Sequence, residues 1–159
     1  MRKILNKYLI DNQEYLKNKI VFLHNDLWSF NSKDLDFVED LNVCENSIWS
    51  YAYGQYLSGK LPIVYGVSFF QIGRLETLRK FFGYNKAPIL IFNAGSYGYD
   101  KYGWEHCIKD NEDISLMREL NFLTIDQNNI INIQQSIRNI FNEFIKKKKN
   151  IYIKLQKDI

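Results

Sequence analysis

Short apolar segments alternate with longer amphipathic segments along the whole chain, and this pattern limits the possible fold more than any other feature. The short segments have the length of buried strands, whereas the longer ones carry apolar residues at helical spacing. Such alternation favours repeated βα units and a mainly parallel sheet. The sequence therefore predicts an α/β fold, with one doubly wound domain over residues 1–159 and about six strands.

The boundaries of these elements follow from apolar periodicity and from Gly and Pro positions. The predicted strands are Ile20–Leu23, Leu41–Cys44, Pro62–Phe69, Pro88–Asn93, Phe122–Ile125 and Ile151–Leu155. The predicted helices are Lys3–Lys17, Glu45–Ser58, Phe70–Phe82, Glu112–Leu120 and Ile133–Lys147. Gly59 and Gly83 follow two of these helices, where a left-handed cap residue is expected.

Composition and charge exclude several classes of protein. No apolar run reaches the roughly 18 residues of a membrane helix, and the N-terminus lacks a signal-peptide pattern, so we expect a cytoplasmic protein with no membrane contact. The net charge of +3 is too small to indicate a nucleic-acid partner. The basic run Lys146–Lys149 favours a solvated helix end over a binding arm. Cys44 and Cys107 have neither metal-ligand spacing nor the density of a disulfide framework.

Reactive side chains cluster where the predicted strands end. Ligands of parallel sheets bind beyond the carboxyl ends of the strands. In chain order, the residues expected at this edge are Asp26, Glu45, Phe69, Phe70 and His106. We therefore expect carboxylates, aromatic rings and a histidine to converge there. His24 also lies just past a strand, where a histidine often only satisfies a backbone carbonyl, and its role is left open.

Glu45 admits two interpretations. Placed at the start of an apolar, aromatic-rich helix, its carboxyl group would lose hydration, which raises the pKa and lets a neutral acid donate a proton to a ring nitrogen. Alternatively, Glu45 only adds negative charge to the first turn of a helix, where the macrodipole favours it.

Together and in this order, several motifs resemble the pyrimidine-binding domain of transketolase-like thiamine diphosphate enzymes. The resemblance spans about residues 20–155, nearly the whole chain. The matching motifs are Glu45 with Ala52 and Gly54 downstream, Gly59-Lys60-Leu61-Pro62, and Glu112-Asp113-Ile114-Ser115-Leu116-Met117-Arg118.

The resemblance implies a role for each residue at the edge of the sheet. Glu45 corresponds to the acid that hydrogen-bonds the cofactor's aminopyrimidine nitrogen, which favours the imino tautomer and makes the exocyclic nitrogen an internal base. Phe70, with Phe69 beside it, corresponds to the ring that stacks on the pyrimidine. Asp26 matches an aspartate near the cofactor. His106 matches an active-site histidine, a proton shuttle in that role, although a structural loop histidine is the alternative.

The resemblance also implies a missing half of the site. In this family a different domain holds the diphosphate and Mg²⁺, through Gly-Asp-Gly and a downstream Asn-Asn. Gly98-Tyr99-Asp100 before Asn128-Asn129 lacks the second glycine, so we do not assign it that role. With the diphosphate-binding domain and a third domain expected to be absent, the chain resembles a separate subunit whose partner supplies the metal site, in an α₂β₂ heterotetramer.

The reaction is less constrained than the cofactor. The leading hypothesis is transfer of a two-carbon ketol unit from a ketose to an aldose. The alternatives are a subunit of a two-component 2-oxo acid decarboxylase, a non-catalytic binding or regulatory module, and an unrelated doubly wound domain. Cys107 replaces a usual second histidine, which leaves the sugar substrate open.

The predicted helix Glu45–Ser58 is unusually aromatic. Its rings cannot all face one core, and aromatic residues are enriched at interfaces, so an interface is favoured over a purely internal packing role. These aromatic residues are Trp49, Tyr51, Tyr53 and Tyr56.

Overall fold

The fold is built on one parallel sheet. The structure is a computed structural model that describes residues 1–25, 34–68, 72–94 and 111–155. Its strands lie in the spatial order β2-β1-β3-β4-β6-β5, and every neighbouring pair is parallel. The strands are β1 (Ile20–His24), β2 (Val38–Asp40), β3 (Leu61–Val67), β4 (Leu90–Ala94), β5 (Leu123–Asp126) and β6 (Ile151–Lys154). The predicted α/β class with a six-stranded parallel sheet is confirmed.

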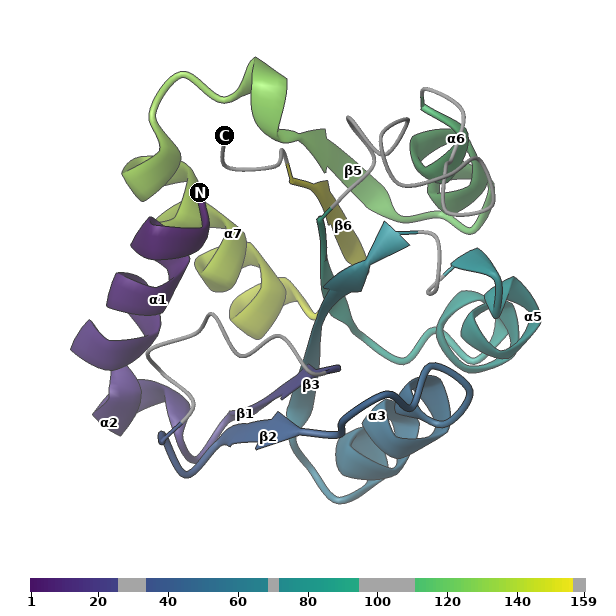
Figure 1. The fold of residues 1–159 in the computed structure, drawn as a ribbon, viewed down its shortest axis with the longest axis horizontal. Helices are drawn as coiled ribbons and strands as arrows, with labels where there is room; N and C mark the ends of the chain where they lie inside the picture. The colour runs from purple at the N-terminus through teal and green to yellow at the C-terminus, as the bar shows by residue number, and fades with distance from the viewer. Residues whose placement is uncertain (26–33, 69–71, 95–110, 156–159) are drawn as a thin grey trace.

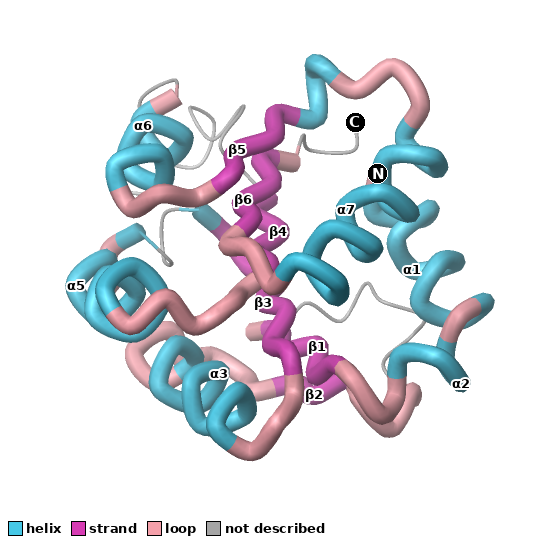
Figure 2. Tube along the Cα trace, turned by 180° about the vertical axis from the view of Figure 1, so that it is seen from behind, coloured by secondary structure: helices cyan, strands magenta, loops and turns pink. Residues whose placement is uncertain are grey.

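Helices cover both faces of this sheet. Figures 1 and 2 show α1 and α7 on one face and α3, α5 and α6 on the other. The helices are α1 (Arg2–Asp11), α2 (Gln13–Leu16), α3 (Ile48–Leu57), α5 (Leu75–Leu78), α6 (Glu112–Glu119) and α7 (Ile133–Lys147), with a π-helical turn η1 (Arg79–Tyr84) and a 3₁₀ turn η4 (Gln127–Asn129). This arrangement is the doubly wound one.

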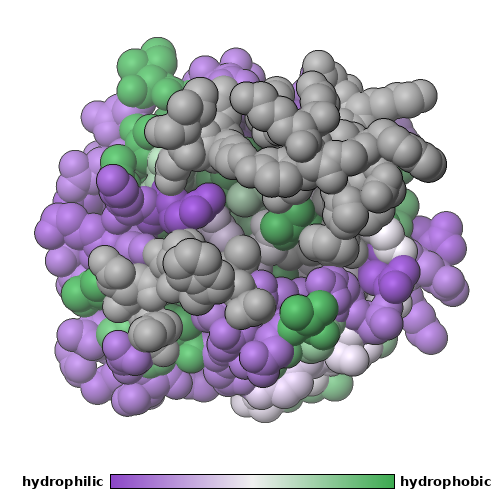
Figure 3. All heavy atoms as spheres, in the orientation of Figure 1, coloured by the Kyte–Doolittle hydropathy of each residue, from purple (hydrophilic) through white to green (hydrophobic). Residues whose placement is uncertain are grey.

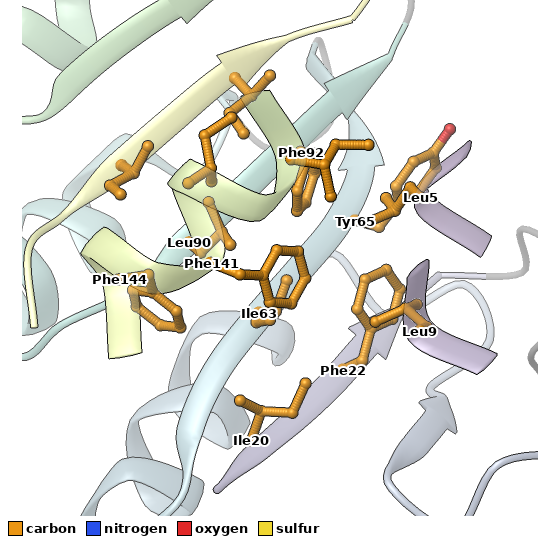
Figure 4. Close-up of a cluster of buried hydrophobic side chains, with 14 of the residues drawn as sticks. Leu5, Leu9, Ile20, Phe22, Ile63, Tyr65, Leu90, Phe92, Phe141 and Phe144 are labelled. Carbon is orange, nitrogen blue, oxygen red and sulfur yellow. The ribbon is translucent and has the colours of Figure 1, made fainter. Parts of the chain in front are cut away.

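Two hydrophobic cores result, because side chains of a strand alternate between the faces of the sheet. On β1, Phe22 belongs to the core under α1 and α7, whereas Val21 and Leu23 belong to the core under α3, α5 and α6. Figure 4 shows the first core, in which Phe141 of α7 packs against Phe92 with the ring centroids 6.4 Å apart. Strands buried on both sides explain the near-continuous apolar runs in the sequence.

The second strand is where the prediction was wrong. The structure places β2 at Val38–Asp40, and the predicted strand Leu41–Cys44 is a loop. The Asp40 Oδ1 atom accepts a hydrogen bond of 2.9 Å from the Asn42 backbone N–H, and Asn42 has φ of 53°. A side chain that bonds the backbone two residues on, followed by a left-handed residue, makes a turn and ends the strand pairing.

The predicted helix Lys3–Lys17 is divided into α1 and α2. Asn12 lies between them, and its Nδ2 atom donates to the Tyr8 carbonyl at 2.8 Å. Asparagine side chains that bond the preceding turn compete with the helical backbone ladder. The helix α1 therefore ends at Asp11, the residue before Asn12.

The glycine caps were predicted correctly in one case of two. Gly59 has φ of 95° just after α3, as expected of a left-handed cap. Gly83 instead lies inside η1, into which α5 continues directly. The predicted helix Phe70–Phe82 is thus seen as α5 and η1, with its first two residues outside the described part of the chain.

Candidate functional site

The strand order places a topological switch point between β1 and β3. The chain leaves β1 for β2 on one side and then returns for β3 on the other. Ligands of open α/β sheets bind beyond the carboxyl ends of the strands at such a point. His24 ends β1 and Ser68 directly follows β3, and their exposed fractions are 1% and 0%. These two residues mark the position of the candidate site.

Residues 41–47, which we name the Glu45 loop, connect β2 to α3. The loop leaves β2 through the turn at Asn42 and enters α3 through a second turn, in which the Ser47 and Ile48 N–H groups donate to the Cys44 carbonyl at 3.0 and 3.1 Å. Glu45 lies in this second turn, three residues before α3 begins. Its side chain is half-buried, so this chain by itself does not bury it as completely as predicted.

Side-chain hydrogen bonds fix the Glu45 loop and the two elements that it connects. The Tyr51 hydroxyl of α3 donates to Glu39 of β2 at 2.6 Å. Arg74, at the start of α5, donates through Nε to the side-chain oxygen of Asn46. Burial, and then the negative charge of Glu45, raises the pKa of the Cys44 thiol. The loop that carries Glu45 is therefore held by Arg74 at the start of α5, and the elements at its two ends, β2 and α3, are bonded to each other.

His24 and Asp40 connect the ends of β1 and β2. The His24 Nδ1 atom lies 3.6 Å from Asp40 Oδ1, and the Leu41 N–H donates to the His24 carbonyl at 2.9 Å. His24 lies on the same face of β1 as Phe22, under α1 and α7. The geometry supports a structural tie at the start of the Glu45 loop, the role that sequence left open.

The aromatic residues of α3 divide between core and surface. Trp49 is fully buried and packs edge-on against Phe82, with the centroids 6.3 Å apart. Tyr53 stacks on Phe81 at 4.6 Å and 9°. Tyr51, in contrast, is 41% exposed. Internal packing onto η1 therefore accounts for two of the rings.

Four other residues were predicted at this site. Asp26, Phe69, Phe70 and His106 all lie outside the described residues. Of the side chains predicted to converge, the structure therefore locates Glu45 alone.

A buried polar network that sequence reasoning missed lies at the ends of β3, β4 and β6. The Tyr152 hydroxyl donates to Asp113 Oδ2 at 2.6 Å and accepts from Asn93 Nδ2 at 3.0 Å. The Lys154 ammonium lies 3.5 Å from Asp113 Oδ1. Ser68 hydrogen-bonds to Tyr152. We call these five residues the Tyr152 network, and the exposed fraction of each is 0%.

The hydroxyl group at the centre of the network stays protonated at neutral pH. Burial, reinforced by the charge of Asp113 and the hydrogen bond to it, raises the pKa of Tyr152 well above 10.0, against the opposing hydrogen bonds from Asn93 and Ser68. Tyr152 is therefore a neutral donor at neutral pH. The sequence did contain one signal. Lys154 interrupts an apolar run two residues after Tyr152, so a charged side chain falls on the same buried face of the strand.

A groove on the described surface lies away from Glu45. A groove of about 480 Å³ lies between α1 and α7, lined by residues such as Tyr8, Asp11 and Arg138. Glu45, the predicted site residue that the structure describes, is not among the described residues that line this groove. On the face shown in Figure 3, described hydrophobic side chains lie singly or in small groups among hydrophilic ones.

Two further features concern metals and membranes. Within residues 1–25, 34–68, 72–94 and 111–155, no three His, Cys, Asp or Glu side chains are grouped so that they could hold a metal ion. Among the helices of those same ranges, none is both long and apolar enough to cross a bilayer.

Comparison with known proteins reveals a structural relative. No protein-family model matches the sequence, and no curated protein sequence is significantly similar to it. A solved structure of a split-gene transketolase, described as an inactive β4 tetramer, superposes with a TM-score of 0.76 and 24% sequence identity. The match covers 98% of this chain and 50% of that chain. This chain therefore has a transketolase-like fold and spans half the length of that protein.

Proposed function

We propose that this chain is the pyrimidine-binding subunit of a split, thiamine diphosphate-dependent transketolase-like enzyme that transfers a two-carbon ketol unit between sugars. The observation that carries the proposal is the superposition of nearly the whole chain on half of a split-gene transketolase. The domain assignment of residues 1–159, with the diphosphate-binding and third domains on other polypeptides or chain segments, is part of the same proposal.

Glu45 fits a cofactor of this kind. Its side chain is half-buried at the carboxyl edge of the sheet, in a loop that Arg74 holds through Asn46, while Tyr51 ties α3 to Glu39 of β2. A half-buried side chain on a loop anchored in this way remains open to a ligand. When bound, thiamine diphosphate supplies the electron sink that cleavage of a carbon–carbon bond beside a ketone needs. In this proposal Glu45 shares a proton with the aminopyrimidine nitrogen.

The remaining residues keep the roles that the resemblance implies. Phe70, with Phe69 beside it, stacks on the pyrimidine, Asp26 lies near the cofactor, and His106 shuttles a proton to or from the sugar. The diphosphate and Mg²⁺ ligands come from a second subunit with Gly-Asp-Gly and Asn-Asn motifs, in a heterotetramer.

Exposed side chains around Glu45 support a partner at this edge. Val43 is 73% exposed and Tyr51 is 41% exposed. Both lie within a few residues of the half-buried Glu45 in the chain. A partner surface that covers them would also complete the burial of the Glu45 carboxyl group, which favours its protonated form.

The proposal is tested by reconstitution. The chain is mixed with a candidate subunit from the same genome that carries both motifs, and binding of thiamine diphosphate with Mg²⁺ is followed by calorimetry. We expect binding by the mixture and not by either chain alone, and ketol transfer from a ketose to an aldose. Tight binding by the isolated chain would contradict a site shared between subunits.

Glu45→Gln and Glu45→Ala then test the acid. Both keep the loop's backbone contacts, and we expect them to reduce turnover strongly without unfolding the protein. The matched control is Glu119→Gln, which makes the same charge change at an exposed position at the end of α6. An assembled complex that stays fully active with Glu45→Ala would favour the regulatory alternative. Release of CO₂ from 2-oxo acids without ketol transfer would favour the decarboxylase.

A further inference from the structure

The Tyr152 network joins two parts of the fold that sequence separates widely. Tyr152 and Lys154 lie on β6, Asn93 lies on β4, and Asp113 lies in the first turn of α6. Ser68 completes the network at the end of β3. The register of β3, β4 and β6 places Ser68, Asn93, Tyr152 and Lys154 on the face of the sheet that α3, α5 and α6 cover. Asp113 meets them there from α6.

The network holds α6 by its first turn. Lys154 Nζ lies 3.5 Å from Asp113 Oδ1 and donates to Asn111 Oδ1 at 3.4 Å. Asn111 is the residue just before α6 and has φ of 64°. An aspartate in the first turn also interacts favourably with the helix macrodipole. Two contacts from one ammonium group and one from Tyr152 therefore set how α6 begins.

The other end of the network reaches the candidate site. Ser68 is the last described residue before the segment that carries Phe69 and Phe70, and it stands beside the switch point. Its hydroxyl bonds to Tyr152 and lies 3.5 Å from the Ala94 carbonyl of β4. Displacing Tyr152 would therefore remove the tie between Ser68 and β6 and leave Ser68 with its contact to β4.

Hydrogen bonds are electrostatically stronger in a dry interior than in water, so a buried polar network favours one arrangement of the elements it joins. We infer that Tyr152 is a positioning residue of the proposed site: it fixes Ser68, just after β3, and Asp113, in the first turn of α6, in one mutual arrangement. This inference rests on the proposed function, since it assigns a role toward the same cofactor. Tyr152 itself is buried and does not touch the ligand in this role.

The test compares two tyrosines of the same sheet. Tyr152→Phe removes the hydroxyl at the centre of the network. Tyr65→Phe removes a hydroxyl from an equally buried tyrosine, of which 1% is exposed, on the α1 and α7 face. Both variants of the full chain are studied alone by hydrogen exchange with mass spectrometry, and then in the reconstituted complex.

In the chain alone, we expect Tyr152→Phe to speed amide exchange at least tenfold around residue 68 and in residues 111–119, and Tyr65→Phe to leave both regions within twofold. In the complex, we expect Tyr152→Phe to weaken thiamine diphosphate binding at least tenfold, while Tyr65→Phe stays within twofold. Equal effects of the two substitutions, or unchanged exchange with Tyr152→Phe, would overturn the inference.

Two additional measurements separate the possible failures. A wild-type complex that binds no thiamine diphosphate contradicts the proposed function, whereas the exchange experiment still decides the role of Tyr152. If Tyr152→Phe does not fold, Ser68→Ala replaces it, because it deletes one hydroxyl at the site end of the network. Exchange around residue 68 within twofold of the wild type in that variant would overturn the inference.

Discussion

Replacing Lys154 with methionine should destabilise the protein much more than an ordinary surface substitution. The Lys154 ammonium and the Asp113 carboxylate are both fully buried and 3.5 Å apart. At an effective dielectric constant of about 20, their attraction is about 5 kcal/mol. Removing both charges from water costs several kcal/mol per ion. The attraction and the desolvation thus nearly cancel, and the pair itself adds little net stability.

The single substitution breaks this balance. Lys154→Met removes the attraction, but the Asp113 carboxylate stays out of water with a hydrogen bond from Tyr152. Breaking a buried pair in this way costs about 3–5 kcal/mol. Asp113→Asn leaves the Lys154 ammonium in the corresponding position and should cost a similar amount. The double variant has no buried charge, so we expect it to lose less stability than either single variant.

Urea denaturation at pH 7 measures these free energies, with fluorescence of the buried Trp49 as the signal. The four proteins form a double-mutant cycle, which isolates the interaction between the two positions. Losses that add up in the double variant would refute the reasoning, as would a cost below about 1 kcal/mol for Lys154→Met.

Three further predictions concern stability. Gly54→Ala and Gly59→Ala should change the free energy of unfolding in opposite directions, although an added Cβ would meet no atom within 4 Å at either position. Gly54→Ala removes a helix-interior glycine and should stabilise the protein by about 0.5–1 kcal/mol. Gly59→Ala forces alanine to φ of 95° and should destabilise it by about 1–2 kcal/mol. Urea denaturation that gives both the same sign would contradict this. Folding raises the pKa of Tyr152, so the stability contributed by the protonated hydroxyl is present below about pH 10 and is lost as the pH rises through the folded-state pKa. The free energy of unfolding, measured between about pH 8 and 11, should therefore fall with pH in the wild type and fall less in Tyr152→Phe. The same pH dependence in both proteins would count against this prediction. Phe141→Ala should cost about 3–5 kcal/mol, because this fully buried ring packs on two others, and a thermal or urea midpoint close to the wild type would disprove that.

Local sequence was a good guide to elements and a poorer guide to their ends. The helix Ile133–Lys147 was predicted with its observed bounds, because an apolar stripe at helical spacing extends through it. The prediction of a strand at Leu41–Cys44 was wrong because the Asn42 backbone N–H donates a hydrogen bond to the Asp40 side chain, which makes a turn and ends β2 at Asp40. Apolar residues alone do not reveal such a turn, since Val43 is apolar and yet 73% exposed.

The candidate site was predicted only in outline. Glu45 does lie beyond the carboxyl end of a strand, as the βα pattern required, but its degree of burial depends on what covers the loop. The Tyr152 network was missed because Asp113 and Lys154 are far apart in the chain: Lys154 does interrupt an apolar run, but no local pattern pairs it with Asp113. Only the strand order makes them neighbours.

By itself, the sequence determined the secondary-structure types, the parallel sheet and the two-sided core, because the periodicity of apolar residues is a local property that survives in any tertiary arrangement. The tertiary structure decided which polar groups share one dry interior and which carboxyl group stays accessible. Those outcomes depend on the order of strands in space and on contacts between distant segments, and no local pattern records either.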